Sequence, residues 1–254
     1  MDLNFKEFGQ GDPIIILHGM FGTLDNWQTI GKQLAEHYTV FLIDQRNHGR
    51  SPHTDSINYP ALAEDLGAFM EAHWIYKTHL IGHSMGGKTA MQFATSYPDL
   101  VDKLVVVDIA PKQYEGGHRE IIDALLALNP DNIQSRQEAD TFMESRIEDF
   151  GVRQFLLKNL TRTKAGNYRW KMNLDVINQH YADILAPGIG PDVFEGQALF
   201  LRGEKSNYIL DEDWPDILSH FPNAQLQTVP KAGHWVHAEA PEVLLAAVTD
   251  FLQK

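Results

Sequence analysis

The residue most suited to chemistry is a serine in a glycine-rich turn. The pentapeptide Gly82-His83-Ser84-Met85-Gly86 follows an apolar run, His79 to Ile81, and precedes a segment with a helical pattern. A serine in a sharp strand-to-helix turn is held in a strained backbone conformation that exposes its hydroxyl. Side chains at positions 82 and 86 would collide with such a turn, which explains the two glycines. The pattern therefore predicts that Ser84 is a nucleophile, and the alternative is an incidental serine in a glycine-rich turn.

A serine hydroxyl is a weak nucleophile until a neighbouring base removes its proton, and histidine is suited to this because it titrates near neutrality. The chain has 12 histidines, so their positions must decide between them. His234 stands in a turn of small residues, after the last expected strand and before the C-terminal helix, and is the predicted base. The alternative for His234 is a turn histidine that caps a helix. His237 is expected to be a surface or packing residue, and His83 to shape the wall of the substrate pocket.

An acid must orient the base, and several carboxylates are candidates. The loop after the expected strand Ala198–Leu201 reads Gly203-Glu204-Lys205-Ser206, and further aspartates follow it. Asp108 ends the strand that follows the Ser84 turn, and adjacent strand ends would converge on the same histidine. The residues alone leave these candidates open: Asp108, Glu204, Asp211, Asp213 and, more distantly, Asp175.

Acyl chemistry at Ser84 also requires two N–H donors for the developing oxyanion. The backbone N–H of Met85, directly after the nucleophile, is the first expected donor. The second is expected from the loop after the Ile14–Leu17 run, where Met20 is preferred to Phe21. Because both donors are main-chain groups, the side chain of Phe21 is free to line an apolar substrate pocket.

These residues must be positioned by alternating strands and helices. Continuous β-branched or apolar runs predict buried strands, and helical spacing of apolar residues predicts helices between them. Strands are expected at 3–8, 14–17, 39–43, 79–81, 103–107, 198–201 and 225–229. Helices are expected at 27–37, 59–74, from Ser84 to Tyr97, near 213–220 and at 241–252. The alternation predicts an α/β fold with a doubly wound, mostly parallel sheet, whose strand C-termini carry the active-site loops.

The alternation stops between residues 112 and 196. This stretch is polar, charged and helical in pattern, with helices expected at 121–128, 138–149, 152–160 and 174–184 and no convincing strand. We expect residues 1–111 and 197–254 to form a core domain, and residues 112–196 to form a helical cap over its catalytic edge. Basic cap residues such as Lys158, Arg162 and Arg169 either meet a phosphorylated leaving group or form a solvated helix face.

Composition excludes several classes of function. A chain of 254 residues with 43% hydrophobic residues can bury a large core, and a net charge of −13 argues against nucleic acid or an anionic membrane surface as partner. The chain has no cysteine, and its first residues, MDLNFKEFGQGDP, predict neither a signal peptide nor a spanning helix. A cytoplasmic location is therefore expected. No metal-ligating pair, dinucleotide fingerprint or Walker loop is present, so neither a metal nor another cofactor is expected.

Four motifs together carry a resemblance to a known family: Arg46-Asn47-His48-Gly49, Gly-His-Ser-Met-Gly-Gly-Lys, Val107-Asp108-Ile109-Ala110-Pro111 and Gly233-His234-Trp235-Val236-His237-Ala238-Glu239. The chain resembles the α/β-hydrolase superfamily and, more narrowly, the YbfF-type bacterial esterases. The resemblance implies the α/β-hydrolase fold and carboxylesterase activity that extends to acyl-CoA thioesters. It also implies Asp108 as the acid, with Ser206 as an auxiliary hydrogen-bonding group beside it.

The leading hypothesis is a serine hydrolase for carboxylic esters or thioesters of short to medium acyl chains. A carbon–carbon bond hydrolase uses the same three residues and is the first alternative. A ligand-binding receptor on a hydrolase scaffold is the second, although a pure binder has no need for a nucleophile, a base and an acid together. The expected partner is a small-molecule substrate, and nothing in the sequence indicates the oligomeric state.

Overall fold

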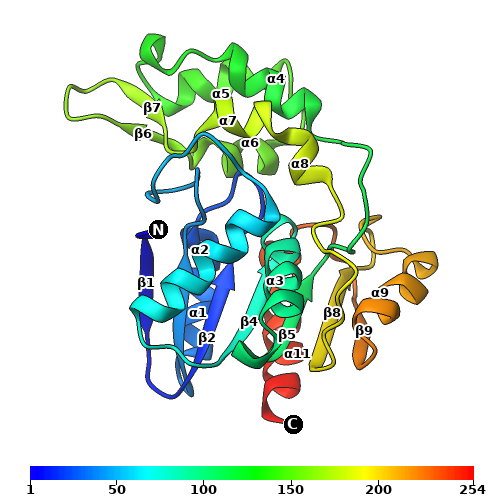
Figure 1. The fold of residues 1–254 in the computed structure, drawn as a ribbon. Helices are drawn as coiled ribbons and strands as arrows, with labels where there is room; N and C mark the ends of the chain where they lie inside the picture. Colours follow the sequence, from blue (N-terminus) through cyan, green and yellow to red (C-terminus); the bar gives the residue numbers. More distant parts are fainter.

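A seven-stranded sheet forms the centre of the molecule (Figure 1), and the computed structural model describes residues 1–254. The strand order is β1-β3-β2-β4-β5-β8-β9. Only β1 runs antiparallel to its neighbour, and every other pair in this sheet is parallel. The strands are β1 Phe5–Phe8, β2 Asp12–Leu17, β3 Tyr38–Ile43, β4 Thr78–His83, β5 Val101–Val107, β8 Gln197–Gly203 and β9 Ala224–Val229. The predicted α/β fold with a mostly parallel sheet is confirmed.

Helices cover both faces of the sheet, as expected for parallel strands that are buried on both sides. The helices around the sheet are α1 Gln28–Leu34, α2 Tyr59–Ala72, α3 Met85–Ser96, α9 Trp214–His220, α10 Val236–Glu239 and α11 Pro241–Gln253. Alternate residues of β2 face opposite layers: Ile14 and Ile16 pack in the apolar cluster that contains α1 and α11, whereas Ile15 and Leu17 pack in the cluster that contains α2 and α3. Both faces of the strand are therefore apolar, and polar groups are found at the strand ends.

The segment between β5 and β8 lies over the C-terminal edge of the sheet (Figure 1). It contains α4 Arg119–Ala127, α5 Arg136–Glu144, α6 Phe150–Leu157, α7 Leu174–Gln179 and α8 Tyr181–Leu185. Its apolar interior also includes Phe21, Ile57, Tyr59, Leu62 and Met85 from the sheet-and-helix layer, so the two parts share one packed cluster. The segment therefore rests directly on the loop that follows β2 and on the start of α3. The division of the chain into a core and a cap at residues 112–196 stays a prediction.

Two expectations for this segment were wrong. It contains a hairpin, β6 Leu160–Arg162 paired with β7 Tyr168–Trp170, where no strand was expected. Each strand has three residues, which is too short for an alternating pattern to stand out from the surrounding helical one. Gly166 supports the turn between them with a φ of 94°. The helix expected at 174–184 is divided into α7 and α8 at His180, whose φ of −102° and ψ of 21° interrupt the helical backbone.

A buried lysine joins the two connections between this segment and the sheet. Lys88 lies in α3, and its side chain is 1% exposed. Its ammonium donates to the carbonyl oxygens of Lys112 at 2.9 Å and Leu185 at 3.1 Å, and also to that of Ala186. Lys112 leads into the segment and the other two residues lead out of it, so a single side chain holds both crossings.

No helix of the structure has the length and apolar character that crossing a membrane requires.

Candidate active site

Ser84 lies at the turn between β4 and α3, with a φ of 52° and a ψ of −120°. This is the strained, left-handed backbone that the glycine-rich turn predicts. A Cβ added to Gly82 would lie 2.2 Å from the carbonyl oxygen of Gly86, and one added to Gly86 would lie 2.5 Å from that of Leu17. Both distances are far below van der Waals contact, so larger residues are excluded from the two positions.

The structure brings Ser84, His234 and Asp108 into one hydrogen-bonded chain. His234 Nε2 lies 3.1 Å from Ser84 Oγ, and His234 Nδ1 lies 2.8 Å from Asp108 Oδ2. Asp108 is a fully buried acceptor, so the nitrogen facing it is assigned as the N–H of the imidazole, and Nε2 is left as the acceptor facing the serine. Burial lowers the pKa of His234, which keeps its ring neutral and able to accept a proton.

Asp108 receives three hydrogen bonds. The backbone N–H of Gly203 donates to Oδ1 at 2.9 Å, and Oδ2 accepts from the hydroxyl of Ser206 and from His234. Burial raises the pKa of Asp108 to about 7, and the donors Ser206 and Gly203 act against that rise because they stabilise the carboxylate. Ser206 therefore donates to the carboxylate that faces the base, next to the acid that the resemblance implied.

The other candidate acids are engaged elsewhere or lie apart from the histidine. Glu204 accepts from the backbone N–H of Lys231 at 2.7 Å, Asp211 pairs with Arg202 at 2.6 Å and Asp213 pairs with Lys112 at 2.6 Å. Asp175 lies in the first turn of α7 and forms no contact with His234. Of the five carboxylates, only Asp108 bonds to the base.

Two main-chain donors at this site have no protein partner. The N–H of Met20, after β2, and the N–H of Met85, at the first position of α3, appear in no hydrogen bond of the structure. The N–H of Phe21 is occupied, because it donates to His48 Nε2 at 3.3 Å. This difference favours Met20 over Phe21, whose side chain is buried and lines the cavity next to Ser84.

Buried histidines hold the loops around the serine. His18 Nε2 accepts the backbone N–H of Gln45 at 3.1 Å, which joins the loop after β2 to the loop after β3. His83 Nε2 lies 2.8 Å from the carbonyl oxygen of His234. His237 is buried and its ring stacks on Trp27 with the centroids 4.8 Å apart, so it is a packing residue rather than a surface one. Burial lowers the pKa of His18 to about 4 and the pKa of His83 to about 3, so these histidines are neutral hydrogen-bonding groups.

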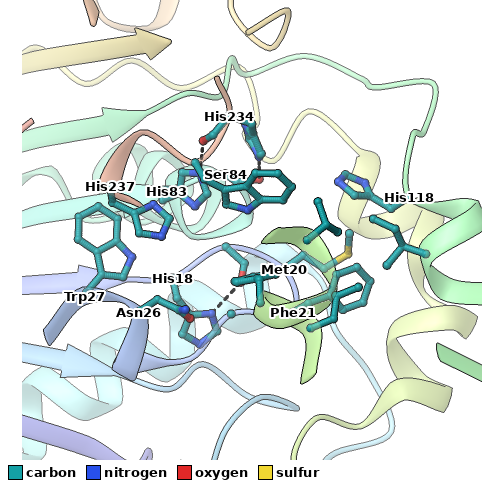
Figure 2. A pocket seen from close by; sticks show the side chains of 17 residues that line it. His18, Met20, Phe21, Asn26, Trp27, His83, Ser84, His118, His234 and His237 are labelled. Atoms are coloured by element: carbon teal, nitrogen blue, oxygen red, sulfur yellow. Dashed lines mark hydrogen bonds between the residues drawn. The ribbon is translucent and has the colours of Figure 1, made fainter. Parts of the chain in front are cut away.

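Two cavities meet at Ser84. The first is narrow, with a volume of about 30 Å³, and lies between the loop after β2, α6 and the turn that carries His234. Figure 2 shows His234 in the upper part of the view with Ser84 directly below it, Trp27, His83 and His237 to the left, and Met20, Phe21 and His118 to the right or below. The second, of about 190 Å³, reaches α8 and is lined by Tyr59, Met85, Ile109, Tyr114, Ile184 and Tyr208, among others. Ser84, Met20 and His118 line both, so the serine faces a space with two arms.

Two residues of the site were missed in the sequence. Tyr208 stacks on His234 with ring centroids 3.8 Å apart and an interplanar angle of 17°. Its place two residues after Ser206 is a signal that could have been used, because that loop was already expected to border the base. His118 precedes α4 and reaches both cavities. No local pattern marks it, since its position depends on how the segment between β5 and β8 folds back.

Comparisons with known proteins agree with this geometry. A family described as alpha/beta hydrolase fold matches residues 12–241. Esterase YbfF of Escherichia coli (strain K12) is 38% identical over 241 residues, which is 94% of this chain and 92% of that protein. The sn-1-specific diacylglycerol lipase ABHD11 of Mus musculus is 39% identical over 247 residues, covering 94% of this chain and 80% of the relative.

A solved structure supports the same assignment. The structure described as a marine microorganism esterase has a TM-score of 0.96 and 44% sequence identity, and the match covers 98% of each chain. The family match spans most of the chain, and both relatives exceed the similarity at which fold and family are shared. The chain therefore belongs to the α/β-hydrolase family, together with the YbfF-type esterases.

Proposed function

We propose that this chain is a serine hydrolase that cleaves carboxylic esters through an acyl-enzyme on Ser84. The observation that carries the proposal is the hydrogen-bonded chain from Ser84 Oγ to His234 at 3.1 Å and from His234 to Asp108 at 2.8 Å. The names of the relatives, an esterase and a diacylglycerol lipase, support an ester substrate.

In this mechanism Ser84 Oγ attacks the ester carbonyl carbon while His234 Nε2 takes the hydroxyl proton. Asp108 fixes the tautomer of His234 and stabilises the imidazolium that forms. The carbonyl oxygen becomes an oxyanion that accepts from the N–H groups of Met20 and Met85. His234 then protonates the departing alkoxide, and the acyl-enzyme remains.

Water completes the cycle by the same steps. His234 takes a proton from the water as its oxygen attacks the acyl carbon, and it returns that proton to Ser84 Oγ as the acid product leaves. The wider second cavity supports a short to medium substrate beside Ser84, and the narrow first cavity leaves room only for a much smaller group. We extend the proposal to acyl-CoA thioesters because the acyl chemistry is the same. A cytoplasmic location and the lack of a nucleic-acid partner stay predictions.

Steady-state and single-turnover hydrolysis of p-nitrophenyl esters of increasing chain length, and of acyl-CoAs, tests the proposal. Ser84→Ala should abolish turnover, and Asp108→Asn should lower kcat by about 10⁴-fold because the imidazole loses its tautomer control. A nearly unchanged Asp108→Asn variant would move the acid to Glu204, Asp211 or Asp213. If the wild type cleaves no ester in the series, the esterase proposal fails, and carbon–carbon bond hydrolysis and ligand binding without turnover become the leading functions.

A further inference from the structure

A three-residue network from both sides of the second cavity ends beside the proposed base. His118 precedes α4, Tyr181 begins α8, and Tyr208 lies in the loop after β8. His118 Nδ1 lies 3.3 Å from the Tyr181 hydroxyl, and His118 Nε2 lies 3.2 Å from the Tyr208 hydroxyl. Tyr208 is itself stacked on His234, so its hydroxyl is held next to the reacting groups.

The direction of each hydrogen bond in this network follows from the number of lone pairs. The oxygen of Tyr181 accepts two backbone N–H groups, from Gly117 at 3.3 Å and from His118 at 3.0 Å. With both lone pairs used, Tyr181 must donate its own proton to His118 Nδ1. Burial lowers the pKa of His118, so the ring is neutral and carries its single N–H at Nε2.

Tyr208 consequently accepts from His118 and keeps its own hydroxyl proton free. No other hydrogen bond of the structure involves the Tyr208 hydroxyl, and this side chain lines the second cavity together with Ser84. Three other polar side chains of that cavity already donate to carbonyl groups. Tyr59 donates to Ile184, Tyr114 donates to the backbone of Tyr208, and the three protons of Lys88 are taken by three carbonyl oxygens. A fourth, Asn207, forms no side-chain hydrogen bond but is exposed to solvent.

We propose that the Tyr208 hydroxyl is a specificity-determining hydrogen-bond donor for an oxygen substituent of the substrate in this cavity. The inference rests on the proposed esterase function and adds a substrate class to it: esters that carry a hydroxyl or a second ester oxygen near the scissile group. The scissile carbonyl oxygen already has the donors Met20 and Met85, so the proton of Tyr208 serves a different oxygen. Two side chains fix the main chain of Tyr208. The Tyr114 hydroxyl donates to the Tyr208 carbonyl oxygen at 2.6 Å, and the Tyr208 N–H donates to Ser206 Oγ at 3.2 Å.

Two matched substrate pairs test the inference. Ethyl butyrate with 2-hydroxyethyl butyrate places the added oxygen in the alcohol, and methyl butyrate with methyl 3-hydroxybutyrate places it in the acyl group. Tyr208→Phe keeps the ring on His234 and removes the donor. We expect kcat/KM for the hydroxylated member of one pair to fall about 3- to 10-fold relative to that of its unsubstituted partner.

Tyr181→Phe is the second variant, because this residue lines neither cavity. Without the proton from Tyr181, His118 can carry its N–H at Nδ1 and accept the proton of Tyr208, so the same preference should weaken. An equal loss on all four substrates would assign the effect of Tyr208→Phe to the position of His234 and overturn the inference. Unchanged preference ratios in Tyr208→Phe would overturn it as well.

Binding separates this inference from the proposed reaction. Ser84→Ala and the double variant Ser84→Ala/Tyr208→Phe can be titrated with 2-hydroxyethyl butyrate and methyl 3-hydroxybutyrate by NMR chemical-shift perturbation. A several-fold weaker affinity for one of these esters in the double variant supports the donor role even if the wild type turns over none of the four. If the single and the double variant bind each ester with equal affinity, the result contradicts the donor role, whatever the enzyme hydrolyses.

Discussion

Ser206 has a fixed orientation that links it to the charge on Asp108. Its oxygen accepts the backbone N–H of Tyr208 at 3.2 Å, and its proton goes to Asp108 because a carboxylate can only accept. The same carboxylate is fully buried, which alone opposes its charge. Ser206 thus favours the ionised form of Asp108, and the acid limb of a pH–rate profile reports the proton taken up by the Asp108–His234 pair.

Ser206→Ala should move that acid limb to higher pH. The variant loses a donor to the carboxylate, so burial is less opposed, the pKa of Asp108 rises and the ionised form is lost sooner as the pH falls. The measurement is kcat/KM for a p-nitrophenyl ester between pH 5 and 9. Ser219→Ala, on exposed α9, is the matched control. An unchanged limb in Ser206→Ala would show that the serine does not act through Asp108.

The identity of the acid shows what a sequence can and cannot decide. Ser84 and His234 were predictable because each stands in a local pattern, a glycine-rich turn and a turn before the last helix. Asp108 competed with four other carboxylates, because loop lengths do not reveal which side chain reaches the histidine. His118 and Tyr208 were beyond local pattern, since their contact with each other joins residues that lie 90 positions apart.

The turn between β4 and α3 tolerates no side chain at Gly86. Gly86→Ala should lower the free energy of unfolding by about 1–3 kcal/mol, because its Cβ would lie 2.5 Å from the carbonyl oxygens of Leu17 and His18. The matched control is Gly67→Ala in α2, where the nearest atom to the new Cβ is a Phe93 carbon at 3.7 Å. That control should gain about 0.5–1 kcal/mol from a lower unfolded-state entropy. Urea unfolding measures both, and equal effects would contradict the steric account.

Lys88→Met should loosen the crossings between the sheet and the segment above it. The variant leaves the carbonyls of Lys112, Leu185 and Ala186 without their buried donor, which should cost about 3 kcal/mol of unfolding free energy. Trypsin cleavage after Lys112 should accelerate. Lys103→Met is the control, because Lys103 donates to the carbonyls of Phe251 and Leu252. If both variants are cleaved after Lys112 at the same rate, Lys88 does not hold the crossing.

Elements of the sheet were easier to predict than those above it. Strands such as β2 and β5 are buried on both faces, so their continuous apolar runs are distinctive. Their predicted starts lie two residues after the observed ones, and their predicted ends coincide with the structure. The hairpin β6–β7 and the break at His180 depend on packing between short elements. Such packing leaves no periodic pattern in the sequence, and both features were missed.

Several neutral, buried histidines make the whole molecule sensitive to acid. Burial lowers the pKa of His18 to about 4 and the pKa of His48 and His83 to about 3, whereas these groups titrate near 6.5 in the unfolded chain. Because the pKa values in the folded state are depressed, the neutral buried rings favour folding above pH 6.5, and this stabilisation is lost as the pH falls toward 4. At pH 5.5 each histidine should lower the free energy of unfolding by about 1.4 kcal/mol, and the three together by about 4 kcal/mol.

Urea midpoints at pH 7.5, 6.5 and 5.5 measure this loss. We expect the free energy of unfolding to fall by about 1 kcal/mol between pH 7.5 and 6.5 and by about 3 kcal/mol more at pH 5.5. His37→Gln changes an exposed position and should leave the pH dependence as in the wild type. Equal midpoints at pH 7.5 and 5.5 would show that the buried histidines are protonated in the folded state.

The neighbouring crossings at Lys112 and Leu185–Ala186 have a consequence for how this molecule can diversify. Seen from the sheet, residues 113–184 are one long loop whose ends are held together by the ammonium of Lys88. The entropy of closing a loop grows slowly, by about 0.6 kcal/mol for each doubling of its length. Insertions and deletions above the sheet therefore cost little stability, while the strand register and the Ser84 turn stay unchanged. Substrate range can change by adding or removing chain in this loop, without altering the residues that carry out the reaction.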